Sequence, residues 1–398
     1  MKHATLYAIS VRILNGRLRL LALLGALFLW GCYPVTDISY SIPQDSSTNQ
    51  WLIEFKTGSD KVQLTMRYSR QRDGGFGFSN TGFEISPDQL VGLTREQAMS
   101  AGAHVQFQLK RDAGTFNFDG WFKEGNGAGH FTFTPSTSFA TELNRQGYGT
   151  PTSEQLLSLA INDVGFGLIN ELNAQGYERP TLEQLVRLGN HGVRLEYVQG
   201  LKSLGYSLKS IELLVKMKDH GVSVNFIREL AALGFSNLSP EELIRTKDHG
   251  VNAKFINDFA VAGYGRLPLD DWITLKDHGI SIRFVAELEP FGYVHLPLDQ
   301  LRRMKDHGVN AAFVQELKQL GYSGLSVEDL IRLKDHGVNG AFIQELKQAG
   351  YTGVPIEQLI RLKDHGVNAA FIQKMKERGY SDLTLDEYVR LRDRGTRE

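Results

Sequence analysis

Cysteine is almost absent from this chain of 398 residues, which contains only Cys32. A single cysteine excludes an internal disulfide, so non-covalent packing must hold the fold together. Hydrophobic residues make up 41% of the chain and charged residues 22%, the proportions of an ordinary soluble protein. The length is sufficient for two or three domains with hydrophobic cores of their own.

An excess of charge of one sign is also missing. The chain has 44 basic and 45 acidic residues, for a formal net charge of -1. Four of the basic residues (Lys2, Arg12, Arg17 and Arg19) and none of the acidic ones lie within residues 1–32, so the remainder carries a charge of -5. Proteins that bind nucleic acid usually carry a basic surface. The mildly acidic remainder therefore argues against a nucleic-acid partner.

The apolar run near the N-terminus is too short to cross a membrane. Leu20–Trp30 follows the basic residues and is followed directly by Gly31 and Cys32. A transmembrane helix needs about 20 apolar residues, whereas a shorter run after basic residues is typical of a signal peptide. The segment Leu-Trp-Gly-Cys at 29–32 resembles the lipobox of bacterial lipoproteins, in which the cysteine becomes the lipidated N-terminus. We predict a signal peptide over residues 1–31, then lipidated Cys32 and a polar tether to residue 48.

The cellular location follows from this prediction. The alternatives are a plain secretory signal and a short membrane anchor, but the position of the sole cysteine directly after the apolar run favours a lipoprotein. Tyr33, rather than an aspartate, follows Cys32, which by resemblance to the sorting rule of enteric bacteria favours the outer membrane. We expect an exported protein that is lipid-anchored to the cell envelope and faces the periplasm or the cell surface.

Residues 49–134 have the pattern of a small antiparallel β domain. Short alternating segments are separated by glycine or Asp-Gly turns, as expected for strands. The predicted strands are Trp51–Phe55, Val62–Tyr68, Phe76–Ile85, Val105–Leu109, Thr115–Phe122 and His130–Phe133. They predict a compact antiparallel sandwich or open barrel of about six strands. The last two strands predict a hairpin with its aromatic side chains on one face.

No catalytic or metal-binding pattern stands out in this β domain. It has no spaced metal-ligand cluster, no phosphate-binding glycine loop and no G-x-S-x-G motif. His104 and His130 are single histidines among apolar residues, and we interpret them as structural. We therefore predict a protein that is not an enzyme and has no cofactor and no metal.

Residues 135–398 contain a repeat of 29 residues. A Gly-aromatic pair recurs at this spacing without any insertion, and the aromatic residues are Tyr148, Tyr177, Tyr206, Phe235, Tyr264, Tyr293, Tyr322, Tyr351 and Tyr380. About eight full units run from 149 to 380, with half units at both ends. A strict period of this length is typical of a solenoid. The fold class is therefore α+β, mainly α: a small antiparallel β domain joined almost without a linker to an α-helical solenoid, as one rigid body.

Each unit predicts two short helices, A and B. In the clearest copy, 323–351, helix A begins after Ser326 and ends at His336-Gly337, and helix B begins after Asn339 and ends at Gly350. An acid or glutamine three residues after the N-cap predicts capping boxes in several copies; the copies are Thr181 with Gln184, Ser239 with Glu242, and Ser326 with Asp329. Helices of about ten residues are not stable alone, so neighbouring units must supply the core.

The repeat carries a ladder of histidines, and six copies read Lys-Asp-His-Gly. The histidines are His191, His220, His249, His278, His307, His336 and His365. We interpret them as structural, either capping helix A by hydrogen bonds to free carbonyls or pairing with polar groups of the next unit. Gly337 belongs to the same cap of helix A, and Gly350 ends helix B in the same way. A metal site is the alternative, but equivalent residues of packed helices lie about 10 Å apart and zinc needs its ligands at about 2 Å.

The repeat string Leu-Lys-Asp-His-Gly-Val-Asn, followed by Phe-Ile-x-Glu-Leu and Gly-Tyr, resembles the extracytoplasmic repeats of some bacterial membrane proteins similar to the BlaR/MecR antibiotic sensors. The resemblance covers roughly residues 50–398. The sensors' zinc peptidase has an H-E-x-x-H helix that is absent from this sequence, so peptidase activity is not implied. The resemblance implies an extracytoplasmic module for sensing or interaction.

The functional hypothesis that best fits these features is a cell-envelope scaffold that binds an unidentified envelope protein or peptide through its repeats. Binding would use outward positions of helix B, unless these are merely solvated. The positions are Arg228, Lys254, Asn257, Arg283, Gln315, Gln344 and Gln373, with the acids Glu229, Glu316 and Glu345 between them. The main alternative is an extracytoplasmic sensor ectodomain that binds a small ligand or a signalling partner. A hydrolase of cell wall or carbohydrate and a nucleic-acid reader are weaker alternatives, because no acid–base pair and no basic surface are apparent.

Overall fold

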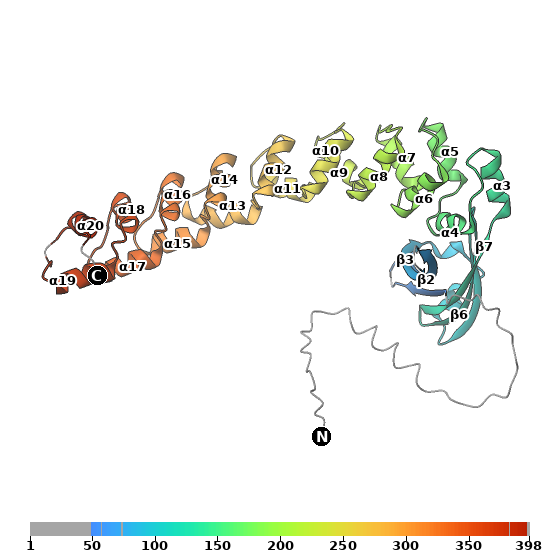
Figure 1. Cartoon of the computed structure of the whole chain (residues 1–398), viewed down its shortest axis with the longest axis horizontal. Coiled ribbons are helices and arrows are strands. Elements are labelled where there is room, and N and C mark those ends of the chain that lie inside the picture. The colour runs from blue at the N-terminus through green and yellow to red at the C-terminus, as the bar shows by residue number, and fades with distance from the viewer. Residues whose placement is uncertain (1–48, 57, 73–74, 382, 396–398) are drawn as a thin grey trace, which may run out of the picture.

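The computed structural model describes residues 49–56, 58–72, 75–381 and 383–395. The predicted signal peptide, Cys32 and the tether lie outside these ranges. A small antiparallel sheet stands at one end of a long, gently arched row of short helices (Figure 1). The predicted class, α+β and mainly α, is confirmed.

The sheet has seven strands, all paired antiparallel, in the order β3-β2-β1-β7-β6-β5-β4. The strands are β1 (Gln50–Phe55), β2 (Val62–Arg72), β3 (Gly75–Ile85), β4 (Leu90–Val91), β5 (Ala103–Arg111), β6 (Gly114–Lys123) and β7 (Asn126–Pro135). All six predicted strands are present. Strand β4 and the short helix α2 (Arg95–Met99) were not predicted, because segments of two and five residues are too short to show a period.

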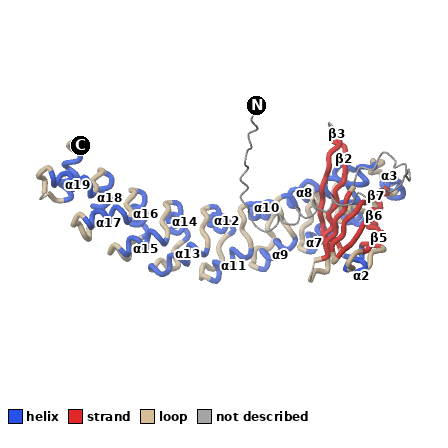
Figure 2. The backbone as a smooth tube through the Cα atoms, turned by 90° about the horizontal axis from the view of Figure 1, so that it is seen from below, coloured by secondary structure: helices blue, strands red, loops and turns tan. Residues whose placement is uncertain are grey.

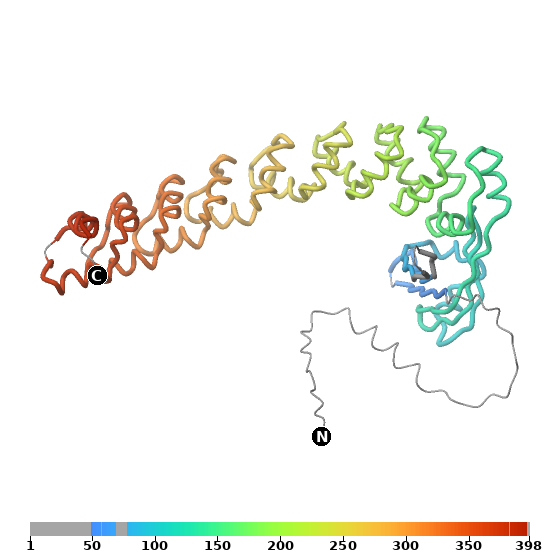
Figure 3. The backbone as a smooth tube through the Cα atoms, viewed as in Figure 1, coloured from blue at the N-terminus to red at the C-terminus, as the bar shows by residue number. Residues whose placement is uncertain are grey.

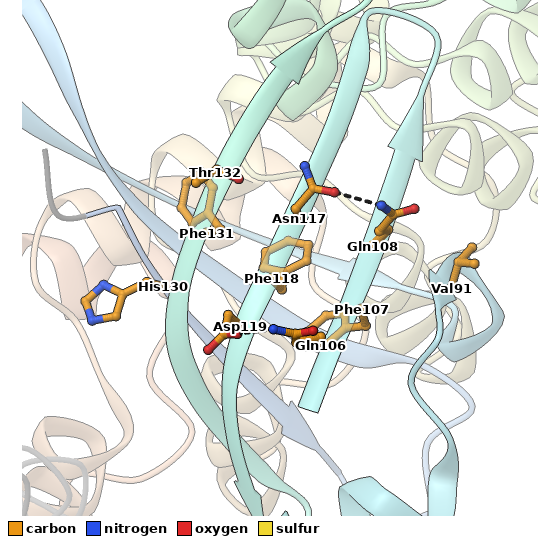
Figure 4. Close-up of a pocket in the computed structure, with 10 residues that line it drawn as sticks. All are labelled: Val91, Gln106, Phe107, Gln108, Asn117, Phe118, Asp119, His130, Phe131 and Thr132. Carbon is orange, nitrogen blue, oxygen red and sulfur yellow. Dashed lines mark hydrogen bonds between the residues drawn. The ribbon is translucent and has the colours of Figure 1, made fainter. Parts of the chain in front are cut away.

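The strands form one sheet, so the prediction of a two-sheet sandwich is wrong, and the open-barrel alternative describes the fold better. Trp51 on β1 and Phe107 on β5 have ring centroids only 5.2 Å apart. These strands are three positions apart in the sheet, which is roughly 14 Å in a flat one. The sheet must therefore curl around its aromatic core, and Figure 4 shows the early strands crossing behind β5, β6 and β7.

The aromatic residues of the predicted hairpin divide between two faces. Phe116, Phe118 and Phe122 on β6 and Phe131 on β7 are buried on the inner face. Trp121 is 63% exposed on the outer face, because successive side chains of a strand point in opposite directions. The prediction of a single aromatic face is thus correct for the phenylalanines and wrong for Trp121.

Two facing glycines make room for Trp51 at the centre of the core. A Cβ on Gly120 would lie 2.7 Å from the indole, and one on Gly129 would lie 2.8 Å from the indole nitrogen. In the space that they leave, Trp51 Nε1 donates to the backbone carbonyls of Asp119, at 3.2 Å, and His130, at 3.1 Å. The inner core thereby holds the backbone of two residues whose side chains lie on the outer face.

The β domain joins the solenoid directly. Strand β7 ends at Pro135 and α3 (Thr137–Arg145) begins two residues later; α4 (Ser153–Ile161) contacts β6 and β7. Helix α5 (Phe166–Ala174) has glycine as its N-cap residue, so it has no N-cap side chain of its own. Asp112, from the turn between β5 and β6, caps the helix instead: its Oδ2 accepts a hydrogen bond from the Phe166 N–H at 2.8 Å. The predicted junction without a linker is therefore confirmed, and contacts distant in sequence reinforce it.

Helices α3 to α20 form the solenoid, in which odd-numbered helices are B helices and even-numbered helices are A helices (Figures 2 and 3). The remaining A helices are α6 (Leu182–Asn190), α8 (Ile211–Asp219), α10 (Pro240–Asp248), α12 (Leu269–Asp277), α14 (Leu298–Asp306), α16 (Val327–Asp335), α18 (Ile356–Asp364) and α20 (Leu385–Asp393). The remaining B helices are α7 (Leu195–Ser203), α9 (Val224–Ala232), α11 (Ala253–Val261), α13 (Ile282–Leu288), α15 (Ala311–Gln319), α17 (Gly340–Gln348) and α19 (Ala369–Glu377). A helices stack on A helices and B helices on B helices.

The helix boundaries agree with the predicted caps. Ser326 accepts from the Asp329 N–H and Asn339 accepts from the Phe342 N–H. Capping boxes are present at Thr181 and Ser239. At Ser326 the predicted box is incomplete, because the carboxylate of Asp329 accepts from the Ser326 hydroxyl instead of its backbone N–H. Aspartate is one methylene shorter than the Gln or Glu of a capping box.

Gly337 offers a test of the capping geometry. It has φ 68°, and a Cβ added there would meet only Lys363 Cε at 3.6 Å, an ordinary contact. Gly337→Ala should therefore lower the free energy of unfolding by about 1 kcal/mol, through the left-handed backbone alone. His336→Ala should cost less, because it removes one exposed polar contact. Urea denaturation of both variants measures the ranking, and the reverse order, or a loss of stability on adding a chelator, would contradict this account of the cap.

Candidate functional site

No metal centre is found in the part of the chain that the structure describes, where no three His, Cys, Asp or Glu side chains are grouped to hold an ion. Among the same residues, no helix has the length and apolar character needed to span a membrane. Three other features are candidates for a functional or a structural role. They are the joints between units, the outward row of helix B and the outer face of the sheet.

The histidine ladder is a set of contacts between neighbouring units. Each histidine is the C-cap residue of its A helix, and its Nδ1 lies 2.5–2.7 Å from the aspartate Oδ1 of the next unit. The pairs are His191–Asp219, His220–Asp248, His249–Asp277, His278–Asp306, His307–Asp335, His336–Asp364 and His365–Asp393. The side chains thus pair between units rather than with carbonyls of their own helix.

The lysine of the triplet reaches back to the preceding unit. Lys334 Nζ lies 4.5 Å from the ring centroid of Phe313, and Lys363 Nζ lies 4.8 Å from that of Phe342. The same cation–π contact recurs at Lys218 on Tyr197, Lys247 on Phe226, Lys276 on Phe255 and Lys305 on Phe284, with Arg392 on Phe371 at the last joint. Lysine and aspartate therefore both face the unit before, and histidine faces the unit after.

The joint between the first two full units departs from the triplet in a way that fits this division. Asn162 replaces the histidine, and its Nδ2 donates to the Oδ1 of Asn190, which replaces the aspartate, at 2.9 Å. Leu168 replaces the aromatic residue, and Gly189 replaces the lysine that would cover it. Both partners change together at each contact, as expected if the triplet exists for stacking.

Further contacts reinforce some of the joints. Arg332 Nη1 lies 2.5 Å from Glu357 of the next unit; corresponding pairs are Arg187–Glu212, Arg245–Asp270, Arg303–Glu328 and Arg361–Asp386. The hydroxyl of Tyr322 donates to the Val354 carbonyl at 2.7 Å. Burial raises the pKa of Tyr322 above its usual value, so this hydroxyl stays protonated as a donor.

The outward row of helix B is exposed from α9 to α19, as predicted. All seven positions from Arg228 to Gln373 face solvent, as do Glu229, Glu316 and Glu345. Part of the charge is neutralised within single helices: Lys254 pairs with Asp258, and Arg283 with Glu287, both at 2.7 Å. The row is thus polar and of mixed charge.

Val261 interrupts this polar surface in the middle of the solenoid. It is the last residue of α11 and is 90% exposed. The equivalent residues of the more regular copies are Gln319 and Gln348. Because a glutamine satisfies the fold at this position, the exposed valine has no structural explanation within the chain.

The outer face of strands β5, β6 and β7 presents a regular array of side chains, here called the outer strip. Cross-strand pairing arranges it in four rows: His104–Trp121–Ala128, Gln106–Asp119–His130, Gln108–Asn117–Thr132 and Lys110–Thr115–Thr134. The expectation of an apolar setting for His104 and His130 is wrong, because both are exposed on this face. The alternation of polar residues along β5 and β6 was the signal that they share an outward face.

Asp119 is the hydrogen-bonding centre of the outer strip. It accepts from Gln106 Nε2 at 2.7 Å, and its other carboxylate oxygen lies 3.2 Å from His104 Nε2. The hydrogen bond from Gln106, with a smaller contribution from His104, lowers the pKa of Asp119 below its usual value, so the carboxylate is ionised at neutral pH. In the neighbouring row, Gln108 Nε2 donates to Asn117 Oδ1 at 2.7 Å (Figure 4).

A shallow cavity of about 520 Å³ lies over the two middle rows of the outer strip. It is lined by Gln106, Gln108, Asn117, Asp119, His130 and Thr132, with Val91 of β4 at its side. This volume is within the range of roughly 300–1,000 Å³ that is usual for small-molecule sites. Asp119 and His130 are the acidic and basic side chains that line the cavity, and its described lining contains no serine or cysteine.

Comparison of the chain with models of known families, with curated proteins and with solved structures finds no match in any of the three.

Proposed function

We propose that the protein is a non-enzymatic scaffold of the cell envelope, anchored by a lipid on Cys32, that holds a protein or peptide partner along its solenoid. The observation that carries this proposal is that different positions of the repeat serve stacking and face solvent. The triplet, the aromatic residues and the buried stripes serve stacking, whereas the helix-B row is exposed and changes along the solenoid, from Arg228 and Asn257 to Gln315, Gln344 and Gln373. Stacked repeats with a variable outer surface are well suited to extended protein contacts.

Val261 is the best candidate for an energetic centre within this surface. Protein interfaces concentrate their binding energy in a few apolar or aromatic residues surrounded by polar contacts. Val261 lies among such polar positions, with Lys254 and Asn257 exposed on the same helix. Its burial by a partner would contribute roughly 1.5 kcal/mol.

Chemical crosslinking of membranes that contain the lipidated protein, followed by affinity purification and mapping of the crosslinks, tests the proposal. We expect one principal partner, crosslinked to residues of the B helices. Val261→Gln should weaken its binding by roughly tenfold, the factor that about 1.4 kcal/mol represents. Because Gln stands at this position in other copies, the fold should be unchanged.

Gln348→Ala is the matched control, since it alters the equivalent position of a regular copy and should leave the affinity unchanged. Crosslinks confined to the sheet, with full binding by Val261→Gln, would show that the solenoid is only a spacer. In that case the proposal fails.

A further inference from the structure

The outer strip combines one exposed aromatic platform with rows of hydrogen-bonding groups. Neighbouring rows are about 6.7 Å apart, since side chains on one face are two residues apart along a strand. Four rows therefore span roughly 20 Å, long enough for a short polymer that lies along the strands. The strip is independent of the surface used by the proposed scaffold function.

Trp121 is held as an open platform at one end. The ring of His104 contacts the indole edge-on, with centroids 5.2 Å apart and planes at 62°. The cross-strand neighbour on the other side is Ala128, whose methyl group covers little of the indole. Leu52 of β1 lies next in the same row and is 48% exposed. Because this indole is exposed, a ligand that stacks on it would bury a large apolar area.

The rows beyond Trp121 offer donors and acceptors in fixed positions. Gln106 is oriented by Asp119, and Gln108 by Asn117. Asn117 Nδ2 donates in turn to Thr134 Oγ1 at 3.3 Å. Each of these amides keeps unused donor or acceptor capacity, because a primary amide has two N–H groups and two lone pairs. Preoriented side chains lose less conformational entropy on binding.

The charge of the strip is low. Asp119 is ionised, and Lys110 stands in the last row, while the middle rows otherwise hold amides, threonine and histidine. An anionic ligand would meet the Asp119 carboxylate without a nearby fixed cation. A protein partner would require an apolar centre that is fully desolvated, whereas here Trp121, with Leu52 in the same row, adjoins polar groups already bonded to one another.

We propose that the outer strip is a binding site for an uncharged glycan built of hexopyranose or N-acetylhexosamine units. The C–H face of one pyranose ring stacks on Trp121. The hydroxyl or acetamido groups of the following units bond to Asp119, Gln106, Gln108 and Asn117. A sugar hydroxyl both donates and accepts, which matches the mixture of amide and carboxylate groups.

Isothermal titration of the chain from residue 33 onward with three hexasaccharides tests the proposal. The probes are cellohexaose, maltohexaose and the β-1,4-linked hexamer of N-acetylglucosamine. At least one should bind saturably, with a dissociation constant between micromolar and millimolar. Trp121→Ala should lower the affinity for it at least tenfold, and Asn117→Ala should lower it severalfold. Trp121→Phe should retain part of the binding, since it keeps an aromatic face.

Phe78→Ala is the matched control. Phe78 is 53% exposed on β3, outside the strip, and Arg67 lies 4.5 Å above its ring, so its removal should not alter glycan binding. Thermal unfolding of each variant verifies the fold. The proposal is overturned if none of the three hexasaccharides binds at millimolar concentration, or if Trp121→Ala binds as tightly as the unaltered chain. Neither outcome affects the scaffold proposal, which is tested on Val261 with a protein partner.

Discussion

Replacing Trp51 with alanine is expected to lower the free energy of unfolding of the β domain by about 3–5 kcal/mol, the usual cost of truncating a buried tryptophan. Trp51 is 1% exposed and contacts the rings of Phe107, Phe118 and Phe122. The two glycines that accommodate the indole would face an empty space after the substitution. Urea denaturation followed by circular dichroism in the β and α regions measures the loss.

Trp51→Phe separates the two roles of this side chain. Phenylalanine keeps most of the apolar contact but cannot donate to the carbonyls of Asp119 and His130. We expect an intermediate loss of stability for this variant. Trp121→Ala, which removes an exposed tryptophan from the same sheet, should change stability by less than about 0.5 kcal/mol. Equal losses at the two tryptophans would show that the assignment of inner and outer faces is wrong.

Replacing Cys32 with serine is expected to abolish metabolic labelling by fatty acid and to release the protein from membranes. The prediction depends on the sequence alone, because Cys32 lies outside the described residues. The reason for a complete effect is chemical: the chain has no other thiol to accept the lipid. Membrane fractionation of cells grown with a labelled fatty acid measures both outcomes.

Gly31→Ala is the matched control for Cys32→Ser, since it keeps a small residue before the thiol and should preserve labelling. Labelling that persists in Cys32→Ser would exclude lipidation at this residue. Loss of labelling without release from the membrane would instead indicate that residues 20–30 act as a membrane anchor.

The helix boundaries of the solenoid could be predicted almost to the residue, because capping residues mark the same boundaries in many copies of the repeat. Ser326, Asn339 and Gly337 each recur in equivalent positions, so an error in one copy is corrected by the others. The β domain has no such redundancy. Its strands were recognisable from alternation, whereas the single curled sheet depends on contacts such as that between Trp51 and Phe107, which no local pattern contains.

The partners of the triplet were only partly predictable. Pairing between units was one of the structural interpretations. The sequence did not show, however, whether each residue of the triplet contacts the preceding or the following unit. The C-terminal half unit held the signal: Arg392 and Asp393 keep the charge types of lysine and aspartate, while Arg394 replaces the histidine. In the structure, Arg392 and Asp393 contact the preceding unit.

The outer strip was missed for a different reason. His104, Asp119 and Trp121 lie on separate positions of two strands, and only the register of β5 with β6 brings them together. Register is set by the turn and by the buried face. The phenylalanines showed which face of each strand is buried, but they did not show which residues of neighbouring strands lie opposite one another.

The repeated joint has an evolutionary consequence. Because a unit's backward-facing lysine and aspartate fit the forward-facing aromatic residue and histidine of any regular copy, the joints do not distinguish one such copy from another. Whole units can therefore be gained by duplication of the coding sequence, or lost by deletion, without any need for new contacts at the joints. The exposed positions of helix B are free to diverge meanwhile, since none of the recurring joint contacts uses them. Such an architecture separates the inheritance of the fold from the evolution of its exposed surface.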